Sequence, residues 1–171
     1  MGKDYPIIKD SYQTVFSPQT AYQMTSILEG VVKRGTAKKI KDLKLNIAGK
    51  TGTTNKNTDT WFIGFTSNLL IGVYVGSDNP VSLGKYETGS KTALPIFKEF
   101  IKKVVKKSEA RPFKAAKGTV MMVVDPITGQ KAKFTSKNTI IEVYKKENVI
   151  NGEVLYSNND RLDVNNILKF Y

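Results

Sequence analysis

The stretch Ile47-Ala48-Gly49-Lys50-Thr51-Gly52-Thr53-Thr54-Asn55, followed after a short polar link by Trp61-Phe62-Ile63-Gly64-Phe65-Thr66, decides how this 171-residue chain is organised. Both runs have the length of a β-strand, and the second is rich in aromatic and branched side chains. A third such run, Leu69 to Ser77, follows the two-residue connection Ser67-Asn68, which is the spacing of a β-hairpin. The sequence therefore predicts three neighbouring antiparallel strands over 45–53, 60–66 and 69–77.

Apolar residues at helical spacing predict one helix on either side of these strands. The first begins at the N-cap Ser17, has Pro18 in its first turn and extends to about Arg34, where Gly35 favours an end. The second is predicted over 90–107. Two segments are predicted to be largely loop: 36–46 and 78–89. Together these elements predict an α+β fold in which the three-stranded antiparallel sheet packs with two helices.

From about residue 113 the composition changes toward short strands. Strands are predicted over 118–125 and 130–134, joined by the turn Pro126-Ile127-Thr128-Gly129. Residues 139–146 are predicted to be another strand or a short helix. The chain is therefore predicted to divide in two: a main unit over 1–112 and a small β-rich C-terminal extension over 113–171.

Composition excludes several kinds of site. The chain has no cysteine and no histidine, so disulfides, thiolate metal sites, imidazole ligands and the usual general base are all absent. We therefore expect no metal and no cofactor. No apolar run approaches the roughly 18 residues that suggest a membrane-spanning helix. The opening Met1-Gly2-Lys3-Asp4 is not followed by the apolar stretch of a signal peptide.

A net charge of +12 suggests an anionic partner, which could be nucleic acid, a membrane surface or a cell-wall polymer. The second helix is predicted to carry a basic face, but such a face is more often simply solvated. Its lysines are Lys98, Lys102, Lys103, Lys106 and Lys107. Nucleic acid is not expected, because Trp61, Phe62 and Phe65 alternate along a strand and are not interleaved with basic residues. The alternative function is a non-catalytic module that binds an anionic polymer, either cell wall or nucleic acid, through its basic surface.

The motif Lys50-Thr51-Gly52-Thr53 contains the groups that hold a carboxylate at the edge of a strand. The lysine supplies positive charge, the threonine hydroxyls donate hydrogen bonds, and the glycine allows a substrate backbone to approach closely. A Lys-Thr-Gly triplet is one of three signatures of enzymes in which penicillin acylates a serine. The triplet Gly49-Lys50-Thr51 also ends like a phosphate-binding loop. However, position 44 is lysine where that loop needs glycine.

Two short matches imitate the other two signatures of these enzymes. Ser82-Leu83-Gly84-Lys85 fits the nucleophile motif Ser-x-x-Lys, and Ser77-Asp78-Asn79 fits Ser-x-Asn. The nucleophile motif needs a helix to bring its two side chains together, yet Pro80 and Gly84 bracket Ser82 in a predicted loop. Both matches also follow the Lys-Thr-Gly triplet, whereas in this class of enzymes they precede it. We therefore reject both.

Many spaced segments agree in order with one known family. They are Ser17 to Met24, Leu28-Glu29-Gly30-Val31-Val32, Arg34-Gly35-Thr36-Ala37, Ala48 to Thr54, Asp59 with Trp61 to Thr66, Gly72 to Gly76, Ser82-Leu83-Gly84, Glu87-Thr88-Gly89 and Ala93 to Phe97. Through them, the stretch from about Ser17 to Phe113 resembles the C-terminal part of the transpeptidase domain of class A, bifunctional penicillin-binding proteins. The resemblance fades beyond Val124.

This resemblance implies a fragment of the fold shared by serine β-lactamases and penicillin-binding transpeptidases. The parent would be a peptidoglycan synthase that cross-links stem peptides by serine acyl transfer, as a D-Ala-D-Ala transpeptidase or carboxypeptidase, and polymerises glycan strands with an upstream glycosyltransferase. Its partners would be stem peptides and β-lactams. An upstream anchor would hold it in the bacterial cytoplasmic membrane, with this domain facing the periplasm or the exterior.

By position, the resemblance assigns Lys50, Thr51, Gly52 and Thr53 to the carboxylate of the substrate or the β-lactam. It also assigns the Thr53 N–H to the oxyanion hole. The nucleophilic serine, its lysine and the Ser-x-Asn residues have no counterpart in this chain, so we expect the chain alone to be inactive. We also expect it to self-associate, because the missing upstream half would leave apolar surface and a sheet edge exposed.

Overall fold

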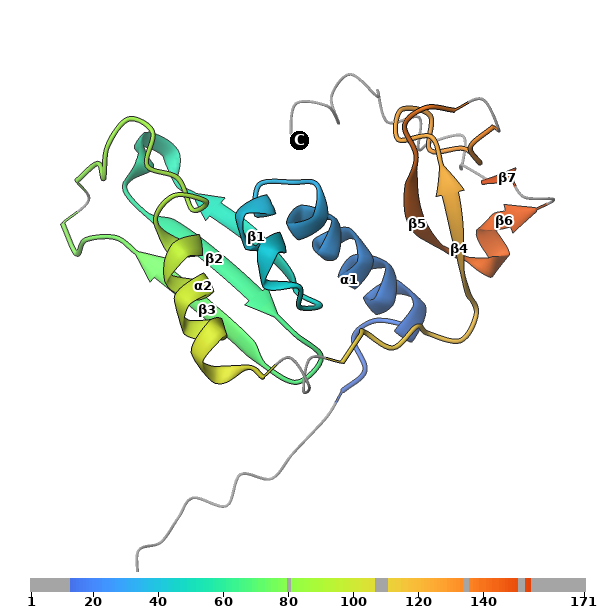
Figure 1. Ribbon diagram of the computed structural model, residues 1–171, viewed down its shortest axis with the longest axis horizontal. Helices are drawn as coiled ribbons and strands as arrows, with labels where there is room; N and C mark the ends of the chain where they lie inside the picture. Colours follow the sequence, from blue (N-terminus) through green and yellow to red (C-terminus); the bar gives the residue numbers. More distant parts are fainter. Residues whose placement is uncertain (1–12, 80, 107–110, 134–135, 151–152, 155–171) are drawn as a thin grey trace, which may run out of the picture.

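The computed structural model describes residues 13–79, 81–106, 111–133, 136–150 and 153–154. It places a three-stranded sheet with its helices beside a C-terminal hairpin, and helix α1 lies between the two (Figure 1). The predictions made for residues 1–12, Pro80, Lys107, Phe134 and 155–171 lie outside the described residues.

The predicted three-stranded sheet is confirmed. Its strands are β1 (Ala48–Thr53), β2 (Thr60–Phe65) and β3 (Leu70–Val75), antiparallel in the order β1-β2-β3. The Thr66 N–H donates to the Leu69 carbonyl at 2.8 Å and closes the β2–β3 hairpin at the predicted turn.

The predicted start of the first strand at residue 45 is wrong. A 3₁₀ helix, η1 (Lys38–Leu43), occupies much of the predicted loop and ends at Lys44, whose φ of 55° is left-handed. Leu45 and Ile47 then pack into the core before the ladder begins. The alternation of apolar and polar residues at 45–47 therefore comes from an irregular segment that packs against the core, and not from a strand.

The first helix is confirmed as α1 (Pro18–Lys33), and the Ser17 side chain accepts a hydrogen bond from the Thr20 N–H at 3.2 Å. The second helix, α2 (Ala93–Val104), is shorter than predicted at both ends. A start at residue 90 would place Pro95 beyond the first turn, where its missing N–H would break the helix. At the other end, Val105 is extended and packs against the core.

Helix α2 and η1 bury one face of the sheet in a single core. Its largest fully buried side chains include Phe62 of β2 and Phe97 of α2, whose ring centroids are 4.7 Å apart. The opposite face stays open over large apolar side chains: Trp61, Ile63 and Tyr74 are each 42–48% exposed. The described residues therefore cover only one side of the sheet.

In the described part of the predicted C-terminal extension, β4 (Thr119–Val124) and β5 (Ile140–Lys145) pair as antiparallel strands. The turn at 126–129 is confirmed, with the Gly129 N–H donating to the Asp125 carbonyl at 2.8 Å. The predicted strand over 130–134 is wrong for its described residues 130–133, which form the isolated bridge Val124↔Lys131 but no strand. All six residues of β4 pair with β5. Of the two alternatives predicted for 139–146, a strand or a short helix, the strand is therefore correct.

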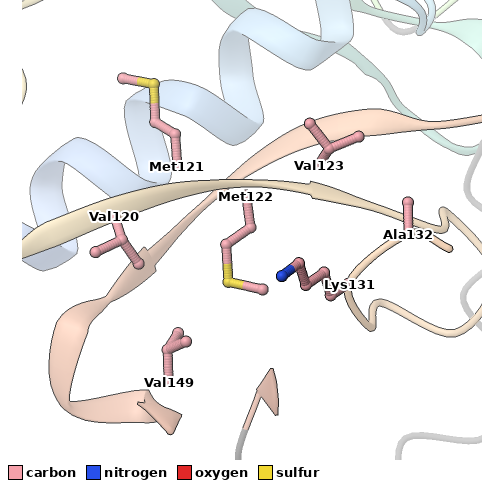
Figure 2. A pocket seen from close by; sticks show the side chains of 7 residues that line it. All are labelled: Val120, Met121, Met122, Val123, Lys131, Ala132 and Val149. Carbon is pink, nitrogen blue, oxygen red and sulfur yellow. The ribbon is translucent and has the colours of Figure 1, made fainter. Parts of the chain in front are cut away.

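Beyond β5 the chain forms η4 (Lys146–Asn148) and the two-residue strands β6 (Val149–Ile150) and β7 (Glu153–Val154). A cleft of about 400 Å³ lies between this segment and β4. Figure 2 shows the side chains of Met122 and Lys131 pointing into the same space, with Val149 below them. This cleft belongs to the extension, while the Lys-Thr-Gly motif lies on the sheet.

Candidate functional site: the edge of strand β1

The four motif residues end strand β1, which is an outer strand of the three-stranded sheet (Figure 1). The Thr54 N–H donates to the Asp59 carbonyl at 3.0 Å, one step beyond the last paired residues of β1 and β2. Because antiparallel ladders alternate bonded and non-bonded pairs, the even-numbered residues of β1 bond to β2. The N–H and C=O groups of Thr51 and Thr53 therefore face the free edge.

The side chains at this edge are polar and close together. The Lys50 ammonium donates to the Thr51 carbonyl at 3.0 Å, which holds the positive charge at the free edge. The hydroxyl of Thr51 lies 3.0 Å from the hydroxyl of Thr36, in the segment that follows α1. An ammonium group, hydroxyls and outward-facing N–H groups thus gather on one strand, an arrangement that suits a carboxylate followed by an extended peptide.

A turn over residues 88–92 fixes the end of the motif from the covered face of the sheet. The Gly89 N–H donates to the Thr53 hydroxyl at 3.1 Å. A Cβ atom on Gly89 would lie 2.4 Å from the Trp61 carbonyl oxygen and 2.7 Å from the Gly52 carbonyl oxygen. Because both obstacles are backbone atoms of the β1–β2 ladder, glycine is required for this close approach.

The loop after β1 holds the segment that contains the Ser-x-x-Lys match. The Asn57 side-chain amide donates to the Gly84 carbonyl at 2.9 Å and to the Lys85 carbonyl at 3.0 Å. The Leu83 N–H donates back to the Asn57 carbonyl at 2.8 Å. Residues 81–87 contain no helix, so the prediction that Ser82 and Lys85 lie in a loop is confirmed.

Asp59 ties the same loop to the sheet. Its carboxylate accepts hydrogen bonds from the Tyr74 hydroxyl at 2.7 Å and from the Thr58 hydroxyl at 3.0 Å, with Thr54 farther away at 3.4 Å. These donors favour the ionised form, so the pKa of Asp59 lies below its usual 3.8, chiefly because of Tyr74.

We expect Asp59→Asn to make the chain less stable at neutral pH and less sensitive to acid. A carboxyl group with a lowered folded pKa stabilises the fold above its unfolded pKa, and this contribution is lost as the pH falls through the folded value. The difference in melting temperature between wild type and variant should therefore narrow as the pH drops below 3.8. Thermal unfolding followed at several pH values measures this gap, and the exposed Asp78→Asn serves as the control. A gap that stays constant with pH would contradict the assignment.

The structure keeps the four predicted site residues together on one strand and adds three that the sequence reasoning did not select: Thr36, Asp59 and Gly89. Each lies in a segment that carries the family resemblance, but its role depends on contacts 15 to 36 residues away in the sequence. Spacing alone therefore gave no signal for them.

Two further features are absent from the part of the chain that the structure describes. No group of three or more acidic, cysteine or histidine side chains is arranged to hold a metal ion there. None of the described helices combines the length and the apolar character needed to cross a membrane.

Comparison with known proteins connects this edge to one family. The model of the penicillin binding protein transpeptidase domain matches residues 8–102. Penicillin-binding protein 1A of Rickettsia conorii is 41% identical over 160 residues, which cover 92% of this chain and 20% of that protein. The protein of the same name from Pseudomonas aeruginosa is 38% identical over 145 residues, covering 79% of this chain and 18% of the relative.

A solved structure agrees with these relatives. The crystal structure of penicillin-binding protein 1A from Haemophilus influenzae superposes with a TM-score of 0.68 at 28% identity, covering 84% of this chain and 22% of that one. The chain thus spans about a fifth of the length of the curated relatives it matches.

Proposed function

Because the chain belongs to the class A penicillin-binding proteins, as part of their transpeptidase domain, we propose that it supplies the carboxylate-binding wall of an acyl-transfer site. The parent is a peptidoglycan synthase that cross-links stem peptides through a serine ester. The substrates of this wall are the C-terminal carboxylate of a stem peptide and the carboxylate of a β-lactam that imitates it.

The free edge of β1 is the observation that carries this proposal. Lys50 and the hydroxyl of Thr51 bind the carboxylate. Gly52 lets the substrate backbone approach the strand. The outward N–H of Thr53 donates to the oxyanion that forms when a serine attacks the carbonyl carbon. The serine, the lysine that takes its proton and the Ser-x-Asn residues come from the part of the parent outside this chain.

The rest of the parent follows from family membership. We propose that it carries a glycosyltransferase and a membrane anchor upstream, with the present domain on the outer side of the cytoplasmic membrane. We also propose that residues 1–112 are the C-terminal portion of the transpeptidase domain and that 113–171 are a C-terminal extension of it. The alternative of an anionic-polymer module draws no support from α2, where Lys98 pairs with Asp42 and Lys102 pairs with Glu99.

Acylation by a labelled penicillin tests the proposed function. The full-length protein that contains this chain is expected to form a stoichiometric adduct. Thr51→Val is expected to lower the efficiency of acylation roughly tenfold, the loss expected for one hydrogen bond to a charged group. Thr25→Val removes a hydroxyl from α1 that bonds only within its own helix, to the Ala21 carbonyl, and serves as the matched control. A full-length protein that is never acylated would refute the proposal.

The chain on its own is expected to give no adduct, because it lacks the nucleophile. A covalent penicillin adduct in mass spectrometry would overturn this expectation. We also propose that the chain self-associates through the open face that carries Trp61, Ile63 and Tyr74, or through the edge of β1. Sedimentation as a monomer at every concentration would contradict self-association.

A further inference from the structure

Helix α1 has a glycine where a helix normally avoids one, and the reason lies in its last turn. Gly30 is buried, and a Cβ atom there would lie 2.8–2.9 Å from three atoms of the Arg34 guanidinium. The arginine therefore folds back across α1 into space that only glycine leaves open. Glycine weakens a helix interior relative to alanine. The placement of the Arg34 guanidinium against Gly30 therefore costs helix stability and needs an explanation.

From this position against Gly30, the Arg34 guanidinium reaches the C-terminal hairpin. Arg34 forms an ion pair and hydrogen bond with Glu142 in β5, and both side chains are largely covered. Burial raises the pKa of Glu142, and the charges of Arg34 and Lys33 only partly oppose this. The cost of desolvating the two charges offsets much of their attraction, so the pair contributes little net stability. It does fix the orientation of β5 relative to α1.

Two glutamines on the same helix hold the hairpin nearby. Gln23 donates to the Val143 carbonyl at 3.1 Å, so α1 covers an edge of β5, and Gln19 donates to the Lys117 carbonyl at 2.9 Å. A cleft of about 400 Å³ separates α1 from the hairpin beside the ion pair. Because apolar packing is incomplete there, directed polar contacts set the position of the hairpin on α1.

The segment that follows the helix end fixed by Arg34 contacts the motif strand. Thr36 lies two residues after Arg34, and its hydroxyl is 3.0 Å from that of Thr51. We propose that Gly30, Arg34 and Glu142 form a latch through which the C-terminal hairpin positions the Thr51 hydroxyl for the substrate carboxylate. This inference rests on the proposed function. It makes Arg34 and Glu142 positioning residues, because they pair between α1 and β5 and lie outside the motif strand β1.

The latch is tested in the full-length protein by separating penicillin binding from the acylation step. Glu142→Ala and Gly30→Ala are each expected to weaken the non-covalent binding of penicillin about fivefold, the effect of misplacing one hydrogen bond, and to change the acylation rate constant less. The two variants act on stability differently, since alanine at position 30 favours the helix while displacing Arg34. Lys102→Ala removes a charge that pairs with Glu99 on α2, away from Arg34 and Glu142, and is the control expected to bind penicillin normally.

A double-mutant cycle distinguishes positioning from general damage to the fold. In the Thr51→Val background, Glu142→Ala is expected to cause no further loss of binding, because the hydroxyl it positions is gone. Exchanging the charges, with Arg34→Glu combined with Glu142→Arg, is expected to restore part of the binding lost in Arg34→Glu alone. Additive losses in the cycle, or normal binding by Glu142→Ala, would overturn the latch and leave the proposed function intact. A wild-type protein that is never acylated would refute the proposed function itself.

Discussion

Replacing Phe97 with alanine is expected to remove most of the stability of the chain, at a cost of about 3–5 kcal/mol. Phe97 is fully buried on α2, and its ring meets the edge of Phe62 at a centroid distance of 4.7 Å. It also lies above Gly64, where a Cβ atom would come within 2.8 Å of the Phe97 ring. The strand backbone thus packs directly against the ring. Because β2 is paired with β1 and β3 on its two edges, it cannot move far enough to fill the cavity that the ring would leave.

Urea unfolding followed by the fluorescence of Trp61 measures this loss, because Trp61 is the only tryptophan of the chain and lies in β2 beside Phe62. A typical domain has only about 5–15 kcal/mol of stability, so the variant should unfold at a much lower urea concentration or fail to fold. Phe100→Ala is the matched control: it removes the same ring from an exposed position on the same helix and is expected to change stability by about 0.5 kcal/mol or less. Equal losses in the two variants would show that the core is not centred on Phe97.

The sequence predicts the sheet well because its signals are local. Apolar runs of strand length, a two-residue hairpin connection and the capped start of α1 each depend on neighbouring residues, and each is found in the structure. The family resemblance adds the order of the elements and points to the edge of β1. The four motif residues then fall on one strand, so their grouping needs no knowledge of the tertiary structure.

The features that sequence reasoning missed depend on distant parts of the chain. The strand predicted beyond the turn at 126–129 is reduced to one bridge at Lys131, on the edge of β4 opposite β5. The six-residue partner of β4 is instead β5, which lies farther along the chain. Leu45 and Ile47 resemble part of a strand in the sequence because both side chains pack against the core, although they lie in an irregular segment. In the sequence, Gly89 looks like an ordinary loop glycine. Only the structure shows that its Cα lies close against the backbone of the β1–β2 ladder.

Gly89→Ala in the full-length protein is expected to reduce penicillin acylation by about 10²-fold, the loss typical of removing one oxyanion-hole donor. The added methyl group would meet the carbonyl oxygens of Trp61 and Gly52 at 2.4 and 2.7 Å. Neither backbone atom can move without disturbing the β1–β2 ladder, so the turn must lift away from the strand. Lifting it breaks the hydrogen bond from the Gly89 N–H to the Thr53 hydroxyl and frees Thr53 to shift.

Comparison with Gly72→Ala shows whether the effect belongs to this contact. Gly72 lies in β3 of the same sheet, and the nearest heavy atom to a Cβ there is Ile63 Cγ1 at an ordinary 4.0 Å. The control is therefore expected to react with penicillin at the wild-type rate. Because a displaced oxyanion donor acts in the transition state, Gly89→Ala should lower the acylation rate constant more than it weakens binding. Loss of binding alone would place the damage at Lys50 and Thr51 instead, and a wild-type rate would show that the turn over 88–92 does not hold Thr53 in place.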